Sequence, residues 1–99
     1  MLTVVQTPTF QSWLDDLKDL KARIRIVARI RRLETGHFGD CAVVGDGVSE
    51  LRVHVGPGYR LYFARRGNTV VILLIGGDKS TQSRDIRRAL QLALEIGEL

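Results

Sequence analysis

Hydrophobic and polar residues alternate between Val48 and Phe63, a pattern typical of half-buried β-strands. Gly56-Pro57-Gly58 interrupts the alternation and predicts a tight connection between two antiparallel strands. A three-residue loop would set Val55 opposite Tyr59, so that the apolar residues of both strands share one face. The same register collects polar side chains on the other face, which we expect to be an exposed surface: Glu50, Arg52, His54, Arg60 and Tyr62.

The segments on either side of this pair carry helical patterns. Apolar residues at helical spacing from Phe10 to Leu17 predict one helix, with Thr7 as its cap. A second helix is predicted from Leu20 to Leu33, where a broad apolar arc is formed by Leu20, Ile24, Ile26, Val27, Ile30 and Leu33. The opposite side of that helix is a basic stripe of Lys21, Arg25, Arg29 and Arg32. A last helix is predicted to begin after Ser80 or Thr81.

The remaining segments complete an α+β pattern. Leu2–Gln6 and Cys41–Val44 are short strand candidates, and Thr69–Ile75 is so apolar that we expect cover on both faces. The run 76–81 is predicted to leave the sheet as a loop. The order β-α-α-β-β-β-β-α predicts a single domain over residues 1–99, with the four later strands in an antiparallel sheet and the two N-terminal helices on its apolar face.

Composition narrows the possible functions. The net charge of +4 and the pI near 9.8 favour an anionic partner, either a nucleic acid or an acidic protein. Cys41 is the single cysteine, so neither an internal disulfide nor a cysteine–histidine metal site is expected, and no cofactor motif is present. We see no signal peptide and no apolar run of about 18 residues, so we expect a cytoplasmic protein that does not enter a membrane.

The polar strand face suggests phosphate chemistry. Arg52, Arg60 and Lys79 could hold a pentavalent phosphate, and Glu50 or His54 could move a proton. Together these groups meet the needs of a metal-free ribonuclease. Two plainer interpretations remain open: the strand residues could form an ion-pair ladder, and the basic stripe could be an ordinary solvated helix face.

Several longer motifs span most of the chain. They are Phe10-x-x-Trp13-Leu14-x-x-Leu17-Lys18-Asp19, Gly36-x-Phe38-Gly39-Asp40, Gly47-Val48-Ser49-Glu50-Leu51-Arg52, Gly56-Pro57-Gly58-Tyr59-Arg60 and Gly76-Gly77-Asp78-Lys79-Ser80-Thr81-Gln82. With these motifs the sequence resembles the addiction-module killer proteins, a HigB-like branch of the RelE/ParE toxin superfamily. The resemblance implies a RelE-like fold and a toxin of a type II toxin–antitoxin pair, whose antitoxin carries a helix-turn-helix domain.

The resemblance also implies an activity, although the superfamily contains two. RelE-like members cleave mRNA on the ribosome without metal, and the killer-protein branch is assigned to that side. ParE-like members poison DNA gyrase on the same fold. We therefore expect a ribosome-dependent mRNA endonuclease; the alternatives are a gyrase inhibitor without nuclease activity and a non-catalytic binding module.

Individual residues follow from the same resemblance. Arg60 matches a phosphate-contacting arginine that follows Gly-Tyr, whereas Arg52 and Lys79 match basic residues of the preceding strand and of the segment after the last strand. RelE has a helix tyrosine where this chain has Ile86, so we expect Glu50 to be the base, with His54 as its rival. The expected contacts to RNA, ribosome or antitoxin are Lys21, Arg25, Arg29, Arg32 and Tyr62.

Overall fold

Within residues 1–97, which the computed structural model describes, five strands and three α-helices follow one another in the expected order. They are β1 (Thr3–Gln6), α1 (Pro8–Asp16), α2 (Leu20–Glu34), β2 (Cys41–Gly45), β3 (Val48–Val53), β4 (Tyr59–Arg66), β5 (Val70–Asp78), a 3₁₀ turn (Lys79–Thr81) and α3 (Gln82–Ile96). The predicted α+β class is confirmed. None of the helices in this range is long and apolar enough to cross a membrane.

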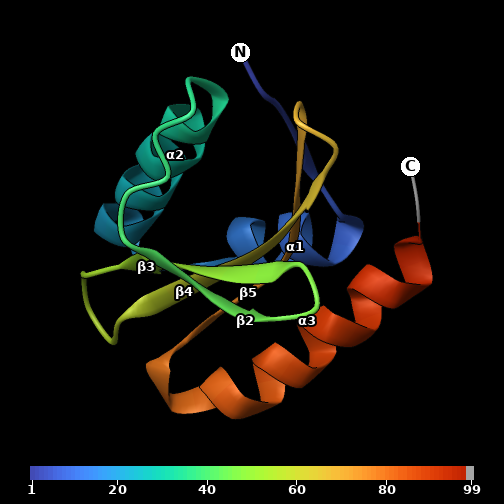
Figure 1. Cartoon of the computed structure of the whole chain (residues 1–99). Helices are drawn as coiled ribbons and strands as arrows, with labels where there is room; N and C mark the ends of the chain where they lie inside the picture. The colour runs from blue at the N-terminus through green and yellow to red at the C-terminus, as the bar shows by residue number, and fades with distance from the viewer. Residues whose placement is uncertain (98–99) are drawn as a thin grey trace.

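The strands form one mixed sheet in the order β1-β5-β4-β3-β2. The four later strands pair antiparallel, as predicted, and β1 joins the edge of the sheet by pairing parallel to β5. Helices α1 and α2 cover one face of the sheet and α3 covers the other (Figure 1). The sheet is therefore buried between two helical layers.

Polar side chains fix where the first two helices begin. Thr7 Oγ1 accepts a hydrogen bond from Phe10 N at 3.0 Å and donates one to the carbonyl of Leu74 at 2.7 Å, so the predicted cap also ties α1 to the sheet. Asp19 caps α2 by accepting from Ala22 N at 3.1 Å. These contacts satisfy N–H groups that a helix start leaves without partners.

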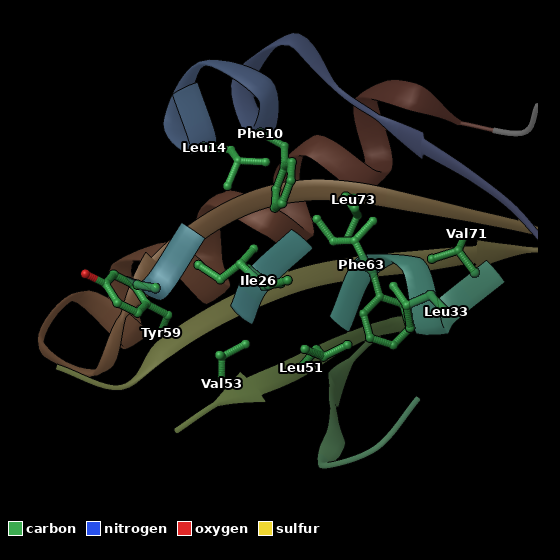
Figure 2. Close-up of a cluster of buried hydrophobic side chains, with 13 residues drawn as sticks. Phe10, Leu14, Ile26, Leu33, Leu51, Val53, Tyr59, Phe63, Val71 and Leu73 are labelled. Carbon is green, nitrogen blue, oxygen red and sulfur yellow. The ribbon is translucent and has the colours of Figure 1, made fainter. Parts of the chain in front are cut away.

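The larger core cluster lies between the sheet and the first two helices. Figure 2 shows Phe10 and Leu14 of α1 and Ile26 and Leu33 of α2 reaching toward the sheet. The sheet contributes Leu51, Val53, Tyr59, Leu61, Phe63, Val71 and Leu73 to this cluster. On the opposite face Ile72 and Leu74 pack with Ala89 and Leu92 of α3, so β5 is covered on both faces as predicted.

The apolar arc predicted for α2 is too broad. Ile26 and Leu33 are fully buried, but Leu20 and Ile24 each keep 70% of their surface exposed. At 3.6 residues per turn, Leu20 and Ile24 lie roughly 120° and 160° around the helix from Ile26, which turns them away from the sheet. These two residues of the predicted arc therefore do not contribute to the core.

The predicted register of the central hairpin is also wrong, by two residues. Val53 pairs with Tyr59 and Leu51 with Leu61, so Arg52 rather than His54 lies opposite Arg60. Strand β3 ends at Val53 and the loop takes residues 54–58, where Val55 N donates back to Val53 O at 2.9 Å. Because a two-residue shift keeps every side chain on its own face, the predicted faces are still correct.

The glycine pair of β5 lies inside the strand instead of leaving the sheet. A Cβ at Gly76 would overlap the Trp13 ring, and a Cβ at Gly77 would overlap the Asp85 carboxylate of α3. The two glycines therefore let helices on opposite faces approach the strand closely. Trp13 packs against the core and makes an edge-to-face contact with Tyr59 at a centroid distance of 6.1 Å.

Candidate functional site

Helix α3 covers much of the polar strand face that the sequence predicted to be exposed. Tyr62 is fully buried, Glu50 is 1% exposed and Arg60 is 8% exposed. The sequence shows the polar alternation but not the helix that packs across it. The expectation of an open polar surface is therefore wrong for these three residues, while Arg52 is half-buried and His54 is exposed.

Glu50 lies at the centre of a buried polar network. Its Oε2 accepts from Arg52 Nε at 3.0 Å, and its Oε1 accepts from Gln82 Nε2 at 2.6 Å. Tyr62 OH donates to Oε1 at a longer 3.5 Å, and Arg60 Nε is 3.8 Å from the same oxygen. Because the protein's own donors surround both oxygens, this carboxylate is arranged to orient cations.

The network also shifts two pKa values. The hydrogen bond and charge of Glu50 raise the pKa of Arg52, and burial, aided by Glu50, raises the pKa of Tyr62 well above its usual range. Both side chains therefore keep their protons at neutral pH. Arg52 stays a cation and Tyr62 stays a neutral donor to the carboxylate.

Arg60 faces an open hollow of about 450 Å³. It lies on β4 between Arg52 and Gly77 of the neighbouring strands, and its Nη1 donates weakly to the Gly58 and Tyr59 carbonyls at 3.4 and 3.3 Å. Its Nε is buried without a hydrogen-bond partner among residues 1–97. Lys79 and His54 line the same hollow, so two cationic side chains and an imidazole converge there.

Asp40 joins His54 to this network. His54 Nε2 is 2.5 Å from Asp40 Oδ2, and Arg52 Nη1 is 3.3 Å from Asp40 Oδ1. The His54 hydrogen bond, with help from Arg52, lowers the pKa of Asp40, so this carboxylate is ionised at neutral pH and can only accept. Nε2 of His54 must then carry the proton, which leaves Nδ1 of the neutral imidazole as its proton acceptor.

Arg29 does not belong to the exposed basic stripe in which the sequence placed it. Its Nη1 donates to the carbonyl of Arg52 at 2.6 Å and its Nη2 donates to the carbonyl of Phe38 at 3.1 Å. Burial lowers the pKa of Arg29. The guanidinium therefore ties α2 to β3 and to the loop that carries Asp40, whereas Lys21, Arg25 and Arg32 are exposed as predicted.

Lys79 begins a capped turn at the end of β5. Asp78 accepts from Ser80 N at 2.8 Å, and Thr81 Oγ1 donates to Asp85 Oδ2 at 2.5 Å. A second hollow of about 370 Å³ continues along the start of α3, lined by Lys79, Ser80, Thr81, Gln82, Ser83, Arg84 and Arg87. The basic surface thus extends from Arg60 onto α3.

Sequence reasoning gave Asp40 and Gln82 no role, although both lie inside the matched motifs. Asp40 is fourteen positions from His54 and Gln82 is thirty-two from Glu50, so no local spacing links either pair. The sequence marks these two residues only as polar side chains inside the motifs: Asp40 follows Gly39, and Gln82 stands at the start of the last helix. In the described part of the chain, no three His, Cys, Asp or Glu side chains are grouped to hold a metal ion.

Two comparisons with known proteins address the family. The family described as "Phage derived protein Gp49-like (DUF891)" matches residues 12–96. A Haemophilus influenzae protein described as uncharacterized is 51% identical over 96 residues, which are 97% of this chain and 97% of that protein. Both matches cover nearly the whole chain. The chain therefore belongs to the Gp49-like family of phage-derived proteins, a toxin-like family related to the RelE/ParE superfamily.

Proposed function

We propose that this chain is a HigB-like toxin of a type II toxin–antitoxin system, with a RelE-like fold, that cleaves mRNA on the ribosome without a metal ion. Membership in a toxin-like family supports the toxin role. The observation that carries the cleavage proposal is Arg60: a guanidinium that is more than nine-tenths buried and faces a hollow shared with Lys79 and His54.

The hollow suits the transition state of phosphodiester cleavage. A pentavalent phosphate carries more negative charge than the diester, and cations already fixed in place stabilise it without reorganising. Glu50 and the strand backbone hold Arg60, while the capped turn holds the backbone of Lys79. In this proposal Arg60 binds the non-bridging phosphate oxygens and Lys79 is the cation beside the leaving oxygen.

His54 is the better candidate for the base, and Glu50 is a positioning residue. Nδ1 of neutral His54 takes the proton of the 2′-hydroxyl, the 2′-oxygen attacks phosphorus, and the bond from phosphorus to the 5′-oxygen breaks. Lys79 protonates the departing 5′-oxygen, leaving a 2′,3′-cyclic phosphate. Glu50 is buried among its own partners, so it acts by orienting Arg52 and Arg60.

The proposed partners are those of a ribosome-dependent toxin. The basic surface along Arg60, Lys79, Arg84 and Arg87 would meet mRNA and ribosomal RNA, since phosphate contacts dominate such binding. A cognate antitoxin, expected to carry a helix-turn-helix domain, would neutralise the toxin. No cofactor takes part in the proposed reaction.

Single-turnover cleavage on mRNA-programmed ribosomes, in the presence of EDTA, tests this proposal. We expect cyclic-phosphate ends with the wild-type protein and a loss of about 10²-fold or more with Arg60→Ala. Arg88→Ala removes the same charge from an exposed site on α3 and serves as the matched control. His54→Gln should lower the rate, whereas wild-type cleavage by folded Arg60→Ala would remove Arg60 from the site.

Expression in growing cells separates the proposal from gyrase poisoning. An mRNA endonuclease should stop amino-acid incorporation before thymidine incorporation, with new mRNA ends inside translated frames. Early loss of thymidine incorporation, an SOS response and intact mRNA would instead assign the chain to gyrase inhibition and overturn the nuclease proposal.

A further inference from the structure

Helix α2 carries an apolar stripe that faces away from the core. Leu20, Ile24 and Ala28 follow one another at intervals of four residues and are all exposed, the first two at 70%. Residues at this spacing lie on one side of a helix, so the stripe extends over roughly 12 Å. Single exposed hydrophobic residues are common, but aligned neighbours form a patch that water solvates poorly.

A groove continues this stripe toward the sheet. It has a volume of about 450 Å³ and lies where α2 passes the end of β3, with Ile24, Ala28 and Val53 as its apolar lining. The rest of the lining among the described residues is basic or imidazole: Arg25, Arg29, Arg32 and His54. The surface thus combines an apolar floor with a rim of one charge sign.

We propose that this groove is a docking surface for an amphipathic, acidic helix of a partner protein. Leu20, Ile24 and Ala28 would receive the apolar face of the helix, at the i, i+3, i+4, i+7 spacing of helix-in-groove recognition. Carboxylates on its flanks would meet Lys21, Arg25 and Arg32. Such complementarity chiefly speeds encounter and fixes orientation, while the buried apolar contacts slow dissociation.

The groove is poorly suited to two other occupants. RNA would leave Leu20 and Ile24 without apolar partners, and no aromatic residue among those lining the groove offers a base a stacking surface. A second copy of the chain would bring the basic rims of both copies together, because the same patch meets itself across a two-fold axis. The like charges of the two facing rims would repel each other and oppose association.

The groove also touches the proposed catalytic hollow, because His54 lines both. A helix docked on α2 would therefore lie against the imidazole. Inhibition of cleavage by this contact rests on the proposed function. The docking of the helix does not depend on that function. A binding measurement consequently tests the groove whether or not the chain is a nuclease.

The probe is a fluorescein-labelled designed peptide of about five helical turns, with leucines at the recognition spacing and glutamates on both flanks. Its affinity for the full chain is measured by anisotropy at low and high salt, beside a scrambled peptide of identical composition. We expect salt-sensitive binding that weakens roughly tenfold or more in Ile24→Asp and in Arg25→Glu. Val43→Asp and Arg88→Glu are the matched controls, because both residues are exposed and lie outside the groove.

Three results would overturn the proposal. The first is equal affinity for the designed and scrambled peptides. The second is binding that Ile24→Asp leaves unchanged while its circular dichroism spectrum matches that of the wild-type protein. The third is a dimer in light scattering, or a single-stranded RNA complex, that Ile24→Asp abolishes, since either would assign the stripe to a different occupant.

Discussion

Replacing Glu50 by glutamine tests whether this buried carboxylate is the counter-charge of the arginine network. The substitution keeps the shape of the side chain and removes its charge. Arg52 can recover part of the loss, because it is half-buried and also pairs with Asp40. Arg60 cannot, because its side chain is 9% exposed and its Nε has no hydrogen-bond partner within residues 1–97.

The expected loss of stability follows from that burial. Removing one partner of a buried ion pair typically destabilises a protein by about 3–5 kcal/mol, because the other charge stays buried. We expect the lower end, about 3 kcal/mol, because one buried cation is left uncompensated and the glutamine oxygen still accepts one hydrogen bond. For a domain of this size such a loss lowers Tm by roughly 12–24 °C.

Thermal and urea unfolding followed by the fluorescence of Trp13, the single tryptophan, would measure this change. Glu95→Gln is the matched control: Glu95 is exposed on α3, so its loss should change stability by less than about 0.5 kcal/mol. A Glu50→Gln protein as stable as this control would refute the reasoning. That result would mean that the backbone of β4, and not the Glu50 charge, holds Arg60 in place.

Three further predictions follow from local contacts. Gly76→Ala should destabilise the fold by about 1–3 kcal/mol or more, because the new methyl group overlaps the Trp13 ring; unchanged urea unfolding would contradict this. A hydrogen bond from a serine hydroxyl holds the pKa of Asp78 below its ordinary 3.8. The ionised carboxylate therefore stabilises the fold, and this stabilisation is lost as pH falls through the lowered pKa of the folded state. Asp78→Asn should flatten the decline in the free energy of unfolding below about pH 4. Arg29→Ala should speed amide hydrogen exchange in residues 36–40, and unchanged exchange would show that the loop does not need the clamp.

The order of elements could be predicted because each carries its own local signal. Thr7 and Asp19 cap helices through contacts three residues away, and the apolar run of β5 is a property of the segment itself. The hairpin register was missed because it depends on the backbone bonds inside loop 54–58, which side-chain alternation does not report. Either register, two residues apart, gives the same faces.

The site could be predicted in its residue types but not in its burial. The sequence identified Arg60, Lys79 and His54, which the structure brings to one hollow. It could not identify α3 as the cover of the polar face, because that packing joins residues far apart in the chain, such as Gln82 and Glu50. The exposed Leu20 and Ile24 were missed for a related reason: an arc of apolar residues does not say how much of the arc the sheet covers.

The parallel pairing of β1 with β5 has a consequence for synthesis. Thr7 hydrogen-bonds to Leu74, which is 67 residues further along the chain, so the first strand and α1 have no sheet to dock on until β5 has been made. At about 5–20 residues per second, that wait lasts roughly 3–13 s. Arg60 and Lys79 also depend on β4 and β5 for their positions. The hollow that Arg60, Lys79 and His54 line therefore cannot assemble until β5 and the turn that follows it have been synthesised.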